Sequence, residues 1–193
     1  MKIAIVKYNA GNTQSVIFAL NRLGIEPVLT DDFETLKSAD KVIFPGVGEA
    51  STTMRHLKEL KLDQLIPNLT QPVLGICLGM QLMCAHSEEN DTECLGIFDL
   101  PVLKFKSEEY KIPHMGWNNL INAEDQLFDS LPDNHMYFVH SYYVPSSKYT
   151  IARTDYINEF SAAIRKDNFY AVQFHPEKSS AQGSKILKNF IDL

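Results

Sequence analysis

Apolar positions in the first 90 residues fall alternately into short continuous runs and into longer stretches with helical spacing. The runs predict strands at 2–8, 27–30, 41–45 and 72–77, and the helical spacing predicts helices at 13–23, 33–39 and 51–60. The first helix is the clearest, because its apolar residues share one face and Gly24 follows as a C-terminal cap. Strands that alternate with helices indicate βαβ units and a parallel sheet.

The second half of the chain has a different pattern. Segments rich in Val, Ile, Phe and Tyr predict strands at 96–106, 135–144, 150–155, 161–165 and 169–174, and an amphipathic helix is predicted at 180–192. No Gly/Ser/Pro-rich linker separates these strands from the first half, so we expect them to extend the same sheet in antiparallel fashion. The predicted fold is α/β: a mostly parallel twisted sheet with helices on both faces, in one domain over 1–193.

Composition narrows the classes of function. Hydrophobic residues make up 45% of the chain and charged residues 22%, and no run approaches the about 18 apolar residues of a membrane span. The apolar run at 1–7 is too short and too soon interrupted for a signal peptide. A net charge of −6 argues against a general surface for nucleic acid or anionic membrane. Three unevenly spaced cysteines favour reduced thiols in the cytoplasm and no zinc site.

Cys77 stands at the end of an apolar run, between Gly75 and Gly79, and the amphipathic stretch 80–85 follows at once. This is the strand–turn–helix pattern of a nucleophile elbow, with sulfur as the nucleophile. We expect a strained backbone at the cysteine and small neighbours that leave room for substrate. At a helix N-terminus, the unpaired N–H groups and the helix dipole favour thiolate over thiol.

A base and a carboxylate occur near the other end of the chain, as His175 and Glu177. Side chains two residues apart on a strand point the same way, and Pro176 favours an extended conformation at His175. With a cysteine, such a pair has the composition of a catalytic triad. An isolated His-x-Glu is more often a packed histidine beside a solvated charge, but the elbow at Cys77 makes the catalytic interpretation the stronger one.

Three motifs resemble class I (triad) glutamine amidotransferases: Gly75–Gln81, Pro45–Gly48 and Val172–Lys178. Within that family, 113–118, 137–142 and 8–12 are similar to the glutaminase subunits of imidazole glycerol phosphate synthases. The resemblance covers nearly the whole chain. It implies a flavodoxin-like fold and hydrolysis of the side-chain amide of L-glutamine, without a metal or an organic cofactor.

The resemblance also implies roles for residues beyond the triad of Cys77, His175 and Glu177. Backbone N–H groups of Leu78 and of the turn at Val47 and Gly48 are expected to stabilise the oxyanion. That turn is expected to rearrange before its N–H points correctly. The residues expected at the substrate are Gly46, Gln81, Glu89, His140, Ser141 and Tyr142. Glu88 adjoins Glu89, and the sequence leaves open which of the two contacts glutamine.

A partner is expected because a free glutaminase would waste glutamine. The resemblance implies a heterodimer with a cyclase subunit of (β/α)₈ barrel fold, which takes ammonia through an internal channel. The products are imidazole glycerol phosphate and an aminoimidazole carboxamide ribotide, in histidine biosynthesis. Asn12, Trp117 and Lys178 are expected at the partner interface.

Three alternatives remain open from the sequence. A glutaminase of this kind can serve another acceptor, such as a sugar-amidating enzyme. A cysteine peptidase or deglycase of similar topology would carry His directly after the elbow cysteine, where this chain has Leu78. A non-catalytic regulatory or binding subunit would be expected to lack a member of the triad, whereas all three are present.

Overall fold

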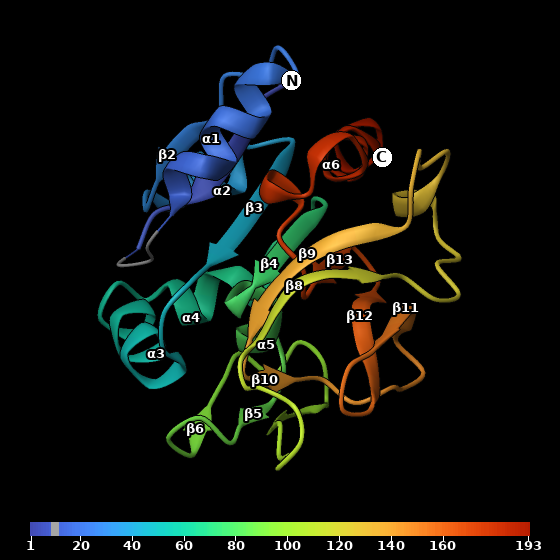
Figure 1. Ribbon diagram of the computed structural model, residues 1–193. Helices are drawn as coiled ribbons and strands as arrows, with labels where there is room; N and C mark the ends of the chain where they lie inside the picture. Colours follow the sequence, from blue (N-terminus) through green and yellow to red (C-terminus); the bar gives the residue numbers. More distant parts are fainter. Residues whose placement is uncertain (9–11) are drawn as a thin grey trace.

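The computed structural model describes residues 1–8 and 12–193 (Figure 1). The centre of the motif 8–12 therefore lies outside the described residues. A seven-stranded sheet forms the middle of the molecule, in the order β11-β12-β13-β4-β3-β1-β2. Its strands are β1 (Ile3–Val6), β2 (Val28–Thr30), β3 (Lys41–Gly46), β4 (Val73–Cys77), β11 (Thr150–Asp155), β12 (Glu159–Lys166) and β13 (Phe169–Val172).

Five neighbouring strands of this sheet, β2, β1, β3, β4 and β13, run parallel, and β12 and β11 continue it antiparallel. The parallel part has the strand order of a flavodoxin-like sheet. The predicted fold class is confirmed, including the antiparallel extension. The expectation of one domain over 1–193 stays a prediction.

Helices cover both faces of the sheet. They are α1 (Thr13–Arg22), α2 (Phe33–Lys37), α3 (Ala50–Glu59), α4 (Leu62–Leu65), α5 (Leu78–Met83) and α6 (Ser180–Asp192), with 3₁₀ turns η1 (Ile66–Asn68), η2 (Gln126–Phe128) and η3 (Pro176–Lys178). The sequence did not predict α4. In the described part of the chain, none of the helices has the length and apolar character needed to cross a lipid bilayer.

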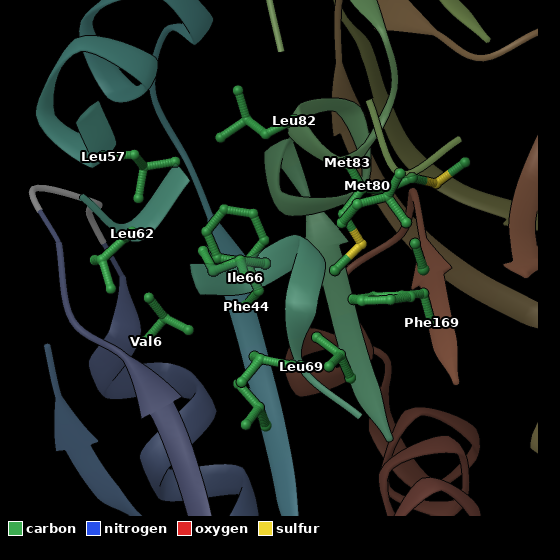
Figure 2. Close-up of a cluster of buried hydrophobic side chains, with 14 of the residues drawn as sticks. Val6, Phe44, Leu57, Leu62, Ile66, Leu69, Met80, Leu82, Met83 and Phe169 are labelled. Atoms are coloured by element: carbon green, nitrogen blue, oxygen red, sulfur yellow. The ribbon is translucent and has the colours of Figure 1, made fainter. Parts of the chain in front are cut away.

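Alternation along the strands divides the interior into two cores. Val42 and Phe44 of β3 face α2 to α5, whereas Ile43 between them faces α1 and α6. Figure 2 shows the first core, where Phe44 lies among side chains of α3, α4 and α5. Strands that are buried on both faces read as continuous apolar runs, which is why the runs at β1, β3 and β4 were visible in the sequence.

The expectation for 96–106 and 135–144 was wrong, because these segments do not join the main sheet. A four-stranded sheet contains β5 (His86–Ser87), β6 (Thr92–Glu93), β7 (Pro101–Lys104) and β10 (Tyr142–Tyr143), and a two-stranded ribbon contains β8 (His114–Asn119) and β9 (His135–His140). The apolar run at 135–144 breaks at Ser141, between β9 and β10. An apolar run indicates burial on a face but does not specify which strand will be its neighbour. In Figure 1 the ribbon crosses the molecule near β4 and β13.

Candidate active site

Cys77 is the last residue of β4 and immediately precedes α5. Its backbone has φ 53° and ψ −108°, a conformation that L-residues rarely adopt. The strained elbow is therefore confirmed. The stretch after it is not amphipathic as expected: every residue of α5 is buried, since the helix fills the space between the sheet and the outer helices.

The glycines beside Cys77 were expected to leave room for substrate, but in the structure they allow close packing. A Cβ on Gly79 would lie 2.0 Å from the Phe44 carbonyl oxygen, and one on Gly75 would lie 2.9 Å from the Met83 sulfur. The missing side chains let α5 pack directly on β3 and β4, and do not leave room for substrate. Gly46 follows the same rule, because its added Cβ would lie 2.6 Å from the Gly79 nitrogen.

His175 and Glu177 come together through a 3₁₀ turn and not through strand alternation. The strand β13 ends at Val172, and Pro176–Lys178 form η3. Nδ1 of His175 lies 2.8 Å from Oε1 of Glu177, and the two side chains are 1% and 2% exposed. The prediction of a contact was correct, its geometric reason was wrong, and Glu177 is not the solvated charge of the alternative reading.

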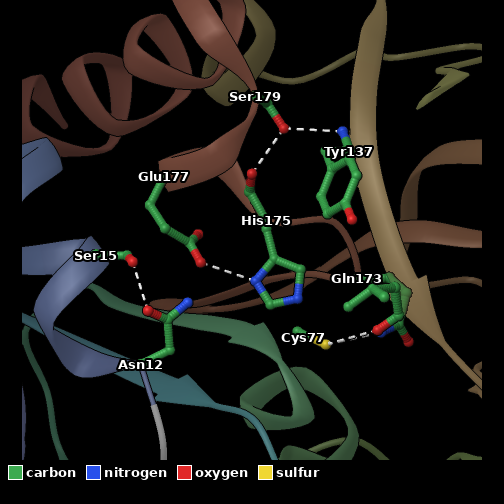
Figure 3. A network of polar contacts seen from close by, with 9 residues as sticks. Asn12, Ser15, Cys77, Tyr137, Gln173, His175, Glu177 and Ser179 are labelled. Carbon is green, nitrogen blue, oxygen red and sulfur yellow. Dashed lines mark hydrogen bonds and ion pairs between the residues drawn. The ribbon is translucent and has the colours of Figure 1, made fainter. Parts of the chain in front are cut away.

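The backbone around His175 is fixed from two sides. The Ser179 hydroxyl donates to the His175 carbonyl at 2.6 Å and accepts the Tyr137 N–H at 2.9 Å (Figure 3). The His175 N–H donates to the Tyr137 carbonyl at 2.9 Å. These bonds join the turn to β9, so the imidazole is held by the ribbon as well as by the main sheet.

The other ring nitrogen of His175 faces Cys77. Nε2 has no hydrogen-bond partner among the described residues, and Figure 3 shows Cys77 on that side of the ring. Burial lowers the pKa of His175, but the negative charges of Cys77 and Glu177 outweigh burial and raise it to about 10. The arrangement thus favours a protonated imidazole beside Cys77 and Glu177.

Cys77 opens into a pocket of about 240 Å³. The pocket is lined by Cys77, by the three residues predicted for the oxyanion (Val47, Gly48 and Leu78) and by all those predicted for substrate except Gly46. Pro113 and Val139, which were not predicted as site residues although they lie in the motifs 113–118 and 137–142, complete the lining. They come from the ribbon region, whose position the sequence pattern did not predict.

The turn after β3 is held at its base by Tyr8. Its hydroxyl donates to the Pro45 carbonyl, and burial, with the nearby charge of Cys77, raises the pKa of Tyr8 well above its usual value. The hydroxyl therefore keeps its proton and its bond. Beyond Pro45 the turn reaches Gly48, which has φ 127° and open space where a Cβ would be. The turn is thus anchored at one end and conformationally permissive at the other.

Glu89 and its neighbour Glu88 have different surroundings in the structure. Oε2 of Glu89 accepts the Ala50 N–H at 2.7 Å, and Glu89 lines the pocket. Burial is the main reason why the pKa of Glu89 is raised. Glu88 instead accepts the Lys104 N–H at 2.6 Å and lies outside this pocket. The two carboxylates follow β5 and are not a helix end, which was the competing interpretation.

Two chains of hydrogen bonds meet at the Tyr142 carbonyl. In the first, Nδ1 of His140 lies 2.8 Å from that oxygen, Nδ1 of His114 lies 3.0 Å from Nε2 of His140, and Asn118 contacts His114 at 3.3 Å. Burial lowers the pKa of His114 to about 4 and that of His140 to about 3. Both rings are neutral at pH 7, and each of them donates through Nδ1.

The second chain leads to Cys77. Nε2 of Gln81 donates to the Tyr142 carbonyl at 2.9 Å and to Oε1 of Gln173 at 3.0 Å. Nε2 of Gln173 in turn lies 3.7 Å from Sγ of Cys77. Gln173 and His114 were not predicted as site residues, although both lie in motifs that carried the family resemblance. A neutral buried side chain has no charge or nucleophile to mark it in a sequence.

The residues predicted at the partner interface lie on β8, in η3 and before α1. Trp117 is 51% exposed on β8, and its neighbour Met115, which the sequence did not single out, is 64% exposed. Lys178 is exposed in η3, which packs between β9 and α1. Asn12 precedes α1 and accepts a hydrogen bond from the Ser15 hydroxyl.

The remaining thiols do not share the surroundings of Cys77. Cys84 is fully buried, and burial raises its pKa well above the usual value; burial and the charge of Glu89 raise the pKa of Cys94 to about 12. Within residues 1–8 and 12–193 no group of three His, Cys, Asp or Glu side chains is placed to hold a metal ion. The expected absence of a cofactor is not tested by that observation.

Comparison with known proteins places the chain in a family. The family model described as glutamine amidotransferase class-I matches residues 4–193. The chain is 61% identical over 196 residues to a protein of Bacteroides thetaiotaomicron named imidazole glycerol phosphate synthase subunit HisH, and 46% identical over 201 residues to one of the same name from Photorhabdus laumondii; in both cases the whole of each chain is covered.

Solved structures agree in fold. A crystal structure of a glutamine amidotransferase has a TM-score of 0.76 at 18% identity and covers 100% of this chain and 98% of its own. A structure titled PurLQS, from Thermotoga maritima, has a TM-score of 0.75 at 18% identity and covers 99% and 97%. The chain therefore belongs to the class I glutamine amidotransferase family, which confirms the resemblance first seen in its motifs.

Proposed function

We propose that this chain is the glutaminase subunit of an imidazole glycerol phosphate synthase and hydrolyses L-glutamine to L-glutamate and ammonia for histidine biosynthesis. The observation that carries the proposal is the buried pair of His175 and Glu177 beside Cys77, the residue that opens into the pocket. The full-length relatives that bear the name of this subunit support the assignment to this synthase over another ammonia acceptor.

The first half of the reaction forms a thioester. The Cys77 thiolate attacks the side-chain carbonyl carbon of glutamine, so that a C–S bond forms and the π electrons move to the oxygen. When the carbonyl reforms, the C–N bond breaks and His175 gives its proton to the departing nitrogen, which leaves as ammonia. Glu177 holds the ring by its bond to Nδ1, with Nε2 directed at the reacting atoms.

The second half returns the enzyme to its starting state. Water attacks the thioester carbon and gives a proton to His175, the C–S bond breaks, and glutamate leaves while Cys77 regains its thiolate. Both halves develop negative charge on the same oxygen. The N–H groups of Leu78 and of the turn at Val47 and Gly48 are the donors that we assign to it, because these residues line the pocket beside Cys77.

Substrate recognition is assigned to the other lining residues. Glu89 presents a partly buried carboxylate to the pocket and is the group that we expect to bind the α-ammonium group of glutamine. Both amide hydrogens of Gln81 bond to the protein, so Gln81 has only its carbonyl oxygen left for substrate. His140, Ser141 and Tyr142 also line the pocket, and we expect their backbone to contact the substrate. Gly46 packs against α5 and is not part of the pocket lining, so its contact with substrate stays a prediction.

The partner that we propose is the (β/α)₈ barrel cyclase subunit, in a heterodimer that passes ammonia through an internal channel. The word subunit in the names of the relatives supports a partner. Its docking face is assigned to the surface that carries Trp117, Met115 and Lys178, together with Asn12. Exposed large apolar side chains beside a site are typical of interaction surfaces.

The triad is tested with Cys77→Ser in the complex with the cyclase. Glutamine-dependent synthesis should fall by a factor on the order of 10⁴ to 10⁶, because loss of a nucleophile has that effect in related triads. Synthesis from added ammonia should persist, since the cyclase site is unchanged. Cys84→Ser, which alters a buried thiol outside the pocket, is the matched control. Glutamine turnover within tenfold of wild type in Cys77→Ser would refute the nucleophile assignment.

A further inference from the structure

We infer that the carboxamide of Gln173 is an additional catalytic group, which binds the Cys77 thiolate through its N–H and fixes the position of the sulfur. The inference rests on the proposed function, in which Cys77 is the nucleophile. Its basis is the contact of 3.7 Å between Nε2 of Gln173 and Sγ of Cys77, between residues 96 positions apart in the chain.

The direction of this contact follows from the Tyr142 carbonyl. A carbonyl oxygen only accepts, so the Gln81 group that contacts it at 2.9 Å must be the NH₂. The same NH₂ contacts the Gln173 side chain at 3.0 Å, and its partner there must be the carbonyl oxygen of Gln173. The remaining end of Gln173, which faces Sγ, is then its NH₂. The amide orientations are thus determined by one backbone oxygen.

The same oxygen also fixes the first chain. His140 must donate to Tyr142 through Nδ1, and the neutral ring therefore accepts at Nε2 from Nδ1 of His114. The Tyr142 oxygen then has two donors for its two lone pairs, and Gln81 cannot turn over without losing both bonds of its NH₂ group. Gln173 is held in this way without any contact to solvent, since it is fully buried.

An N–H directed at sulfur stabilises the charged form of the thiol more than the neutral form, because hydrogen bonds to ionised groups are the stronger ones. The thiol has a second contact that acts in the opposite sense. Sγ lies 3.8 Å from the Val139 carbonyl oxygen, which accepts a hydrogen bond from the thiol and repels the thiolate. Gln173 therefore favours the reactive thiolate, whereas Val139 favours the neutral thiol.

The test uses the rate of alkylation of Cys77 by iodoacetamide as a function of pH, followed on the Cys77 peptide by mass spectrometry. Gln173→Met keeps the length of the side chain but removes the N–H, and should slow alkylation at pH 7 by a factor on the order of ten. The pH of half-maximal alkylation should rise. With the partner bound, kcat for glutamine should fall in a similar proportion, while KM stays within about twofold.

Gln182→Met is the matched control. Gln182 is also a buried glutamine, and its NH₂ donates to the His135 carbonyl at 2.8 Å, away from the thiol. It should lose stability without any change in the alkylation profile. Gln173→Glu is the second variant in case Gln173→Met fails to fold. It keeps the shape but replaces the donor with a carboxylate, and should slow alkylation at least as strongly.

Two outcomes would overturn the inference. One is an alkylation profile of folded Gln173→Met or Gln173→Glu that coincides with wild type. The other is an equal shift in Gln182→Met, which would mean that any loosened core disturbs the thiol. Failure of the proposed function would be recognised by a different result. Glutamine turnover would then persist in Cys77→Ser, while the Gln173 variants could still shift the pH profile of Cys77 alkylation.

Discussion

Gly46, at the end of β3, lies directly opposite Cys77, at the end of β4, in the register of the two parallel strands. Cys77 and the turn that is proposed to supply an oxyanion donor therefore start from neighbouring points of one sheet edge. Ligands bind at the carboxyl ends of strands in open α/β sheets for this reason. His175 follows β13, the strand on the other side of β4, so three adjacent strands supply the proposed chemistry.

The turn at Gly48 is expected to control the glutaminase rate. We expect the isolated chain to hydrolyse glutamine slowly, and the cyclase with its bound ligand to raise the rate by a factor on the order of 10² to 10³, the value of one oxyanion donor. Gly48→Pro removes an N–H and cannot adopt φ 127°, so the stimulated rate should fall far more than assembly with the partner. Glutamate release and gel filtration measure the two effects.

Gly24→Ala is the control for backbone strain, because Gly24 also has a positive φ and open space around it but lies outside the pocket. It should leave the stimulated rate within about twofold of wild type. A full glutaminase rate in the isolated subunit, unchanged by the partner, would contradict control by the turn and leave the triad assignment intact.

Glu89 and Glu88 should differ sharply in their effect on glutamine binding. Glu89→Gln removes a charge from the pocket, and KM should rise by about tenfold to a hundredfold, as for loss of a hydrogen bond to a charged group. Glu88→Gln should change KM less than twofold, since Glu88 bonds to the Lys104 N–H outside the pocket. Steady-state kinetics with the partner present decide between them, and equal effects would refute the assignment of Glu89.

The three thiols should react very unequally. An electrophilic glutamine analogue is expected to label Cys77 alone at pH 7.5, because Cys77 opens into the pocket and lies beside a protonated imidazole. Cys84 is buried, and the pKa of Cys94 is raised to about 12. Peptide mass spectrometry measures the labelling of each cysteine, and Cys77→Ser serves as the unlabelled control. Comparable labelling of Cys94 or Cys84 would count against the proposed activation of Cys77.

Acid should destabilise the protein partly through His140. Its pKa is lowered to about 3 in the folded state, so its contribution to stability is present above the unfolded value near 6.5 and is lost as pH falls from there. His175 does not contribute in this window, because its pKa is raised and its contribution is lost only toward alkaline pH. Between pH 6 and 4, His140→Phe should make the decline in unfolding free energy shallower by up to about 1.4 kcal/mol per pH unit.

Urea unfolding at several pH values measures this slope. Phenylalanine keeps the packing of the ring against Phe105 and Phe160. Loss of the hydrogen bonds to Tyr142 and His114 lowers the stability of the variant but adds no titrating group. His135→Phe is the control, since His135 is exposed on the same strand. A decline in His140→Phe as steep as in wild type would mean that the buried ring does not take up a proton on unfolding.

The sequence by itself determined the parallel sheet and the elbow at Cys77. Apolar runs of the right length at β1, β3 and β4 indicate strands buried on both faces, and the glycines around Cys77 indicate a turn that only small residues permit. These signals are local: each depends on residues within a few positions of one another, so they can be recognised before any tertiary contact is known. His175 and Glu177 were found for the same reason, although through the wrong local geometry.

The tertiary structure alone decided which segments become neighbours. The runs at 96–106 and 135–144 form β7, β9 and β10 outside the main sheet. The hydrophobic period of the sequence does not encode this placement. Two features of the site likewise depend on segments that meet only after folding. They are the contact of Gln173 with Cys77 and the placement of Glu89, but not Glu88, in the pocket. A hydrophobic period specifies which face of an element is buried; the partner on that face is set by the packing of the whole chain.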